Sequence, residues 1–171
     1  MSNTLQDRLN KIQQVGEDRV NAEVQKQNAE EEKREQLFNQ IKELAPRIKE
    51  LVTLANACKN NGVHLTDCVE LNQYDKDSYF FTDGWNHHVG FYCEPLISYI
   101  GIENGGACGA YHLKVDTSGE VKVTMDRGYY LTVTANKKDI STRTLERFVN
   151  EFSNFESRFL NWVDNLNWPW I

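Results

Sequence analysis

The N-terminal third of the chain carries a run of apolar residues at three- and four-residue steps, and this run most constrains the fold. The run comprises Leu37, Ile41, Leu44, Ile48, Leu51, Ala55 and Cys58. This spacing places all of these side chains on one face of an α-helix. A helix cannot bury such a seam against itself. The seam must therefore cover the domain that follows it or pair with a second copy of the chain.

The residues before the seam predict a weaker continuation of the same helix. Leu5, Leu9 and Ile12 begin a regular apolar stripe, whereas residues 25–36 (QKQNAEEEKREQ) offer almost nothing to bury. Gly16 weakens a helix by about 1 kcal/mol relative to Ala. We expect one helical arm over residues 1–62, ending near Gly62, where a left-handed cap is favoured.

Pro46 interrupts this arm. Proline removes one backbone donor and clashes with the carbonyl four residues earlier. The apolar rhythm continues unchanged through Pro46, which favours a kink within one helix. The alternative is a break near Leu44, with Pro46 in the first turn of a new helix.

Beyond Gly62 the pattern changes to that of a sheet followed by one helix. Runs rich in aromatic and β-branched residues alternate with Asp, Asn and Gly turns. These runs are Ser78–Thr82, His88–Cys93, Ser98–Glu103, Ala110–Val115, Glu120–Met125 and Gly128–Thr134. The short links favour antiparallel hairpins. Residues 63–171 are thus expected to form an antiparallel sheet of about five strands and a C-terminal helix on one face, which makes an α+β fold.

The expected C-terminal helix has the strongest core signal of the chain. Ser141 or Thr142 can cap its start. Its apolar residues follow the helical period: Leu145, Phe148, Val149, Phe152, Phe155, Phe159, Leu160, Val163 and Leu166. A stripe this rich in phenylalanine should pack on the apolar face of the sheet.

Composition limits the classes of partner and the compartment. Nineteen Lys and Arg residues stand against 25 Asp and Glu residues, giving a net charge of −6. Because neither half of the chain is basic, direct nucleic-acid binding is not expected. No secretory signal and no apolar run of about 18 residues is present, so a cytoplasmic protein outside the membrane is expected. The four cysteines lack a CxxC motif and are read as reduced thiols, with a disulfide framework as the alternative.

A glycine-rich loop is the one candidate for chemistry. Gly105, Gly106, Cys108 and Gly109 precede an expected strand. Backbone N–H groups of such a loop can face an anion, and Cys108 could act as a nucleophile with His112, His88 or His64 as base. The alternative is a tight turn with a packed cysteine. Neither a metal nor another cofactor is predicted, because paired ligands at zinc spacing are lacking.

Two aromatic segments are candidate partner surfaces. Trp85, His87 and His88 are expected at a hairpin tip or edge, and Trp168 and Trp170 lie near the C-terminus. Exposed tryptophans are typical of surfaces that bind other proteins. The alternative in each case is that the segment packs against its own sheet.

Two motifs together carry a family resemblance over roughly residues 40–160. They are Leu44–Leu51 (LAPRIKEL), running on to Ala55–Cys58 and Asn61-Gly62, and the loop Gly105–Gly109 before a strand. These motifs resemble small uncharacterised proteins carried by phages and other mobile elements of bacteria. The resemblance implies a bacterial or phage-infected cell and an accessory role, such as binding and modulating a host or defence protein.

We therefore predict a non-catalytic protein-binding modulator, an inhibitor of a host or defence protein in the setting that the resemblance implies. It is expected to form a homodimer through the seam of Leu37, Ile41, Leu44, Ile48, Leu51 and Ala55. The alternative is a small enzyme or ligand-binding module centred on Cys108.

Overall fold

A computed structural model describes residues 3–68, 71–75, 78–83, 86–93, 96–104, 111–127, 131–134 and 137–167. The chain divides into two compact units, Met1–Gln36 and Leu37–Ile171. This division lies earlier than the boundary expected at residue 62. The reason is that the helical residues from Leu37 onward belong to the core of the second unit.

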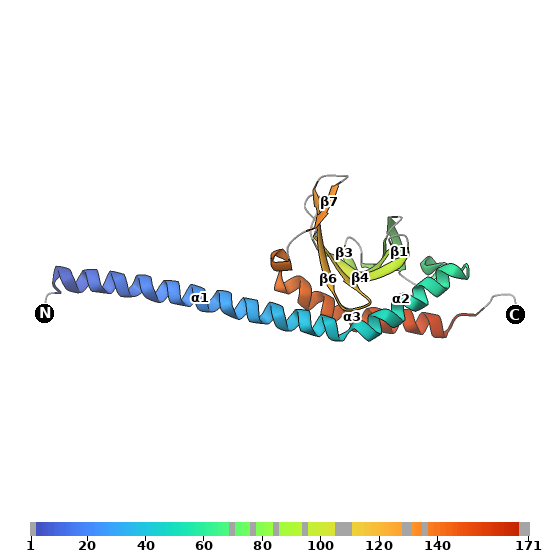
Figure 1. The fold of residues 1–171 in the computed structure, drawn as a ribbon, viewed down its shortest axis with the longest axis horizontal. Coiled ribbons are helices and arrows are strands. Elements are labelled where there is room, and N and C mark those ends of the chain that lie inside the picture. The colour runs from blue at the N-terminus through green and yellow to red at the C-terminus, as the bar shows by residue number, and fades with distance from the viewer. Residues whose placement is uncertain are drawn as a thin grey trace. The chain divides into compact units, whose positions relative to one another are not determined.

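Three α-helices and one sheet make up the described structure, which confirms the predicted α+β class (Figure 1). The helices are α1 (Leu5–Glu43), α2 (Ala45–Asn60) and α3 (Thr142–Asp164), with short 3₁₀ turns at Leu65–Asp67 and Lys137–Asp139. The strands are β1 (Leu71–Asp75), β2 (Ser78–Asp83), β3 (Asn86–Cys93), β4 (Ile97–Asn104), β5 (Tyr111–Asp116), β6 (Val121–Arg127) and β7 (Leu131–Thr134).

The seven strands form one antiparallel meander whose spatial order is the order in the sequence. Six of them coincide with the six runs identified above. The strand that sequence reasoning missed is β1, in which Leu71 is the one fully buried apolar side chain. The period-2 pattern is consequently too weak in β1 to be recognised.

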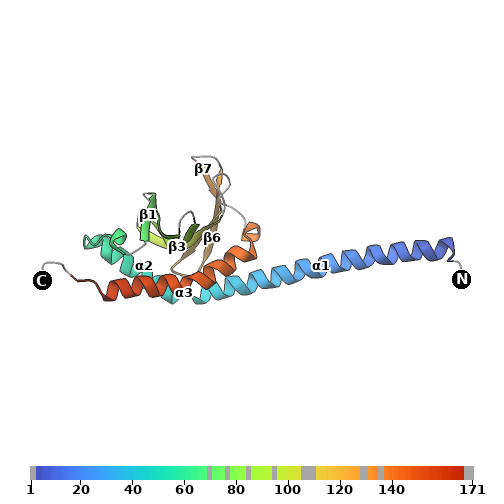
Figure 2. The same cartoon turned by 180° about the vertical axis from the view of Figure 1, so that it is seen from behind.

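Helices α2 and α3 cover one face of the sheet, and the sheet bends away from them, so that β1 and β7 rise on either side of β3 and β4 (Figures 1 and 2). The core lies between the helices and this face. From strands β2 to β6 it takes side chains that face the helices, among them Phe81, Val89, Phe91, Ile100, Ile102, Leu113, Val115, Val121 and Val123. The aromatic stripe of α3 lies in the same core, as predicted.

The seam belongs to this core too, which corrects its assignment to self-association. Ile41, Ile48, Leu51 and Ala55 are fully buried within the second unit, Leu37 nearly so, and Leu44 is partly buried against the core. A side chain already buried by its own sheet is not available to a second copy. The alternative reading, in which the seam covers the sheet, is the one that the structure shows.

Polar contacts fix the two helices on the sheet. The side-chain amide of Asn56 donates to the carbonyl of Ile97 at 2.8 Å and accepts from the Ile97 N–H at 3.0 Å, which ties α2 to β4. Arg47 of α2 donates through Nε to both carboxylate oxygens of Glu156 of α3, at 2.9 and 3.1 Å. The hydrogen bonds to Glu156 raise the pKa of Arg47 above its usual value, so the guanidinium stays charged.

The helix boundaries follow from Pro46 and Gly62. Helix α1 ends at Glu43, and Pro46 lies in the first turn of α2. Leu44 alone separates the two helices, with its backbone still helical at φ −76° and ψ −8°, and this arrangement matches the alternative of a second helix with Pro46 in its first turn. Pro46 cannot donate to the turn before it, so the hydrogen-bond ladder stops there. At the other end, Gly62 adopts φ +73° and the Val63 N–H bonds to the Cys58 carbonyl at 2.8 Å, as expected for a glycine cap.

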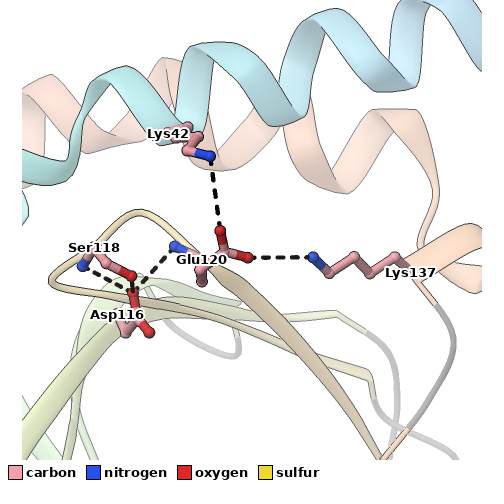
Figure 3. A network of polar contacts seen from close by, with 5 residues as sticks. All are labelled: Lys42, Asp116, Ser118, Glu120 and Lys137. Atoms are coloured by element: carbon pink, nitrogen blue, oxygen red, sulfur yellow. Dashed lines mark hydrogen bonds and ion pairs between the residues drawn. The ribbon is translucent and has the colours of Figure 1, made fainter.

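The turn between β5 and β6 packs against the junction of α1 and α2. One carboxylate oxygen of Asp116 accepts from the N–H and the hydroxyl of Ser118 and from the N–H of Glu120 (Figure 3). The carboxylate of Glu120 lies between two lysines, with Oε1 3.8 Å from Lys42 Nζ and Oε2 3.7 Å from Lys137 Nζ (Figure 3). Gly119 has φ +84°, and a Cβ on it would come within 2.9 Å of the Lys42 backbone. Only glycine satisfies both the conformation and the close approach.

Candidate functional site

The first unit exposes an apolar stripe. Helix α1 starts with a reciprocal cap, in which the Asp7 N–H donates to the Thr4 hydroxyl and the Thr4 N–H donates to the Asp7 carboxylate. Within Met1–Gln36 the aliphatic side chains of the helix lie in water, and their exposed fractions are 72% for Leu5, 50% for Leu9, 69% for Ile12, 45% for Val15, 61% for Val20 and 48% for Val24.

Gly16 leaves a depression in this stripe. A Cβ at Gly16 would meet nothing within 4 Å. The depression is mostly apolar at its floor, and its lining residues are Arg8, Lys11, Ile12, Val15, Gly16 and Arg19. An apolar side chain of another helix could pack into this depression, which is surrounded by cationic side chains.

In the second unit, a bulge in β3 places His88 on the same face of the sheet as Val89, whereas His87 lies on the other face. Phe80 pairs with Gly90 and Thr82 with His87, so His88 and Val89 both lie opposite Phe81. A bulge of this kind shifts the alternation by one residue. His87 therefore faces the side of the sheet away from the helices, and His88 faces α3. His87 and His88 follow Asn86, the first residue of β3, and both contact acids of their own chain.

On the face away from the helices, Glu103 lies between two histidines. Its carboxylate is 3.6 Å from His87 Nε2 and 3.4 Å from His112 Nδ1. The hydroxyl of Tyr92 is 3.5 Å from the same His112 nitrogen. These residues come from β3, β4 and β5, and all are at least half-buried.

Two buried polar atoms beside this cluster lack a hydrogen-bond partner within the described part of the chain. They are His87 Nδ1 and the hydroxyl of Thr124, whose residue is 5% exposed. Thr124 pairs across the strands with His112. A polar row thus crosses this face from His87 to Thr124 among aromatic side chains such as Phe80 and Tyr92.

On the helix side, His88 begins a chain of three polar side chains. His88 Nδ1 lies 3.2 Å from Glu151 Oε2, and Arg147 Nε donates to Glu151 Oε1 at 3.0 Å. Arg147 also donates to the backbone carbonyl of His87 at 2.7 Å. The first turns of α3 are thereby fixed to the bulge of β3, and the carboxylate of Glu151 orients the His88 ring.

His88 and Glu151 line a pocket of about 260 Å³ between α3 and strands β2 and β3. Phe81, Val89 and Phe155 form its apolar floor, and each is almost fully buried. Thr82, Asn154 and Arg158 complete its wall, with the Arg158 guanidinium 3.9 Å from the centre of the Phe81 ring.

Several predicted site residues lie outside the described part of the chain. These are Trp85 and the tail residues Trp168 and Trp170, together with the loop residues Gly105, Gly106, Cys108 and Gly109. Cys58, Cys68 and Cys93 are buried in the core. Burial raises the pKa of Cys68 to about 11 and raises that of Cys58, so both thiols stay protonated at neutral pH. Among the described residues, no group of three His, Cys, Asp or Glu side chains is arranged to hold a metal ion.

Sequence reasoning missed the acids that pair with the histidines. Glu103 lies in β4 and Glu151 in α3, far from His87 and His88 along the chain. The one available signal was the spacing of four residues between Arg147 and Glu151 on the polar side of α3. The bulge that brings His88 to the face of Val89 could not be read from the period-2 pattern of the sequence.

No protein-family model, curated protein or solved structure matches this chain. In the described structure, none of the helices combines the length and the apolar character that crossing a membrane requires.

Proposed function

We propose that the chain is a non-catalytic protein-binding protein that forms a homodimer through its helical arm, residues 5–36. The observation that carries the proposal is the exposed aliphatic stripe from Leu5 to Val24. A polar helix of this kind gains most of its stability in water from packing its apolar face, and Gly16 weakens it further. A second helix would supply that packing.

The charges that follow the stripe favour a second copy in antiparallel orientation. At alternating steps of three and four residues, the stripe continues as Arg19, Glu23, Lys26, Glu30 and Lys33. In a parallel, in-register pair each of these charges would face its own copy, so that acid meets acid and base meets base. In an antiparallel pair with Arg19 opposite Glu23 of the second copy, these opposite charges meet, and Leu9 and Ile12 pack on the side-chain stems of Lys33 and Glu30 of that copy.

Molar mass in solution, measured by light scattering over a range of concentrations, tests the dimer. The full chain is expected to approach twice its 19.8 kDa mass as concentration rises. The double substitution Leu9→Gln and Ile12→Gln should shift the equilibrium to the monomer. The control Leu96→Gln removes a leucine that is 59% exposed in the second unit and should leave the mass unchanged. A wild-type chain that stays monomeric throughout would overturn the proposal.

A charge reversal tests the orientation. Glu23→Lys places a cation opposite cations in an antiparallel pair, so it should weaken association by about tenfold or more. In a parallel pair it exchanges one repulsion for another. Glu32→Lys makes the same change of charge away from the stripe and serves as the control. Equal effects of the two reversals would contradict the antiparallel arrangement.

The resemblance to phage and mobile-element proteins supports an extension of this proposal. In it, the dimer acts in the bacterial cytoplasm by covering a surface of a host or defence protein. Expression of the wild-type chain should then raise the plating efficiency of a phage on a defended host. The Leu9→Gln, Ile12→Gln variant should not do so. Equal plating with both chains would reject the link between the arm and inhibition.

A further inference from the structure

The pocket between α3 and strands β2 and β3 has room for one small ring system. Its volume is about 260 Å³. This volume lies below the range of roughly 300–1,000 Å³ that is typical of sites for drug-sized ligands, but above the roughly 150 Å³ of an apolar cavity that binds benzene. Its floor consists of Phe81, Val89 and Phe155, each at most 2% exposed. The pocket therefore suits an apolar body of about one or two rings.

Both charged side chains that line the pocket are engaged within the chain. Glu151 accepts from Arg147 Nε through Oε1 at 3.0 Å, and its Oε2 lies 3.2 Å from His88 Nδ1. The Arg158 guanidinium lies 3.9 Å from the centre of the Phe81 ring and has a further interaction within its own chain. A charged ligand would lose its hydration without gaining an unpaired counterion, which is costly. The pocket therefore favours a neutral ligand.

His88, which lines the pocket, offers a hydrogen-bond acceptor. An ionised carboxylate only accepts hydrogen bonds, so His88 Nδ1 carries the hydrogen that is directed to Glu151. In the neutral imidazole the second nitrogen, Nε2, is then an acceptor. No other residue in the described part of the chain forms a hydrogen bond with His88. A ligand with one N–H or O–H group can therefore donate to Nε2.

We propose that this pocket binds a small neutral aromatic molecule that carries one N–H or O–H donor, for which indole is a suitable probe. The donor hydrogen-bonds to His88 Nε2, and the ring packs against Val89 and Phe155. Phe155 already makes an edge-to-face contact with Phe81, at 5.4 Å between the ring centroids, so the floor is aromatic as well as apolar. The contact with Glu151 orients the His88 ring before a ligand binds, which lowers the entropic cost of binding.

Titration of the full chain with indole, benzofuran and benzylammonium tests the proposal. Benzofuran has the shape of indole but no N–H group, and benzylammonium has donors but also a positive charge. The readout is the NMR chemical shift of the Val89 methyl groups in methyl-labelled protein. Indole should produce a saturable shift, whereas each of the other two should bind at least about fivefold more weakly. Absence of a saturable indole shift, or equal affinity for benzofuran or benzylammonium, would overturn the proposal.

A substitution at His88 tests the hydrogen bond. In His88→Asn the side-chain amide can take the place of Nδ1 and donate to Glu151, but nothing replaces Nε2. The indole affinity should fall about fivefold or more, to that of benzofuran, while the control His64→Asn, at an exposed histidine, should bind indole as the wild type does. If His88→Asn does not fold, the ¹⁵N chemical shift of Nε2 in the wild type decides the matter, because it should move with indole and not with benzofuran. Wild-type affinity in the variant, or an Nε2 shift that indole leaves unchanged, would contradict the role of His88 and with it the proposal.

Discussion

At the scale of single residues, two glycines show that a left-handed backbone and close packing are separate constraints. Gly62 and Gly119 both adopt positive φ, but their surroundings differ. Nothing lies within 4 Å of a Cβ at Gly62, whereas a Cβ at Gly119 would approach Lys42 Cα and its carbonyl oxygen at 2.9 Å each. The two positions therefore separate conformational cost from steric cost.

Alanine substitution at these two glycines should destabilise the fold unequally. Gly62→Ala is expected to lower the free energy of unfolding by about 1–2 kcal/mol, the cost of a left-handed conformation for a residue with Cβ. Gly119→Ala carries that cost together with a displacement of the α1–α2 junction, so its loss should be larger. Urea unfolding of both variants measures the difference, and equal losses would contradict the close packing at Lys42.

Asp116 makes this turn sensitive to acid. Partial burial opposes its ionisation, but hydrogen bonds from Ser118 and from the N–H groups of Ser118, Glu120 and Gly119 outweigh burial and lower its pKa. A carboxyl with a lowered folded-state pKa stabilises the fold above its unfolded pKa of about 3.9, and this contribution is lost as pH falls through the folded value. The wild type should therefore exceed Asp116→Asn in stability at pH 7. Thermal unfolding from pH 7 to pH 3 should show the gap closing below about pH 4, and a gap that is constant with pH would reject this role.

At the scale of elements, helix α3 carries the centre of the core. The Phe155 ring contacts those of Phe81, Phe91 and Phe159, with centroids 5.4, 5.0 and 6.4 Å away. These rings join two strands and one helix. The helix contributes to the fold through this shared packing, since its propensity alone would not hold it in place.

Removing a phenylalanine from this stripe should be costly. Phe155→Ala, or Phe152→Ala in the same stripe, is expected to cost about 3–5 kcal/mol because it removes buried apolar area and leaves a cavity. Ser157→Ala, at an exposed position of α3, should change little and provides the control. Calorimetric melting measures all three. An unchanged melting temperature in both phenylalanine variants would show that α3 packs elsewhere.

The elements could be predicted to different extents, for physical reasons. Helix α3, its cap at Ser141 and six strands follow from periodicity and turn residues, because burial on one face imposes a regular pattern. The sequence could not show what the seam packs against, because the pattern of Leu37–Cys58 is the same whether a sheet or a second helix covers it. The pocket residues escaped prediction because His88, Glu151 and Arg158 meet only through the bulge of β3 and the docking of α3.

At the scale of the whole molecule, the two units use their apolar residues in different ways. The second unit buries its helical seam under its own sheet, and the first exposes its stripe. The exposed stripe of the arm is therefore the surface through which we propose that two chains associate.

Hydrogen exchange of the arm amides at low and high protein concentration tests this account most directly. If the arm pairs with a second copy, protection of residues 5–24 should rise by about tenfold or more with concentration, while protection of the core strands stays constant. Arm amides that exchange at the same rate at every concentration would contradict self-association through the arm.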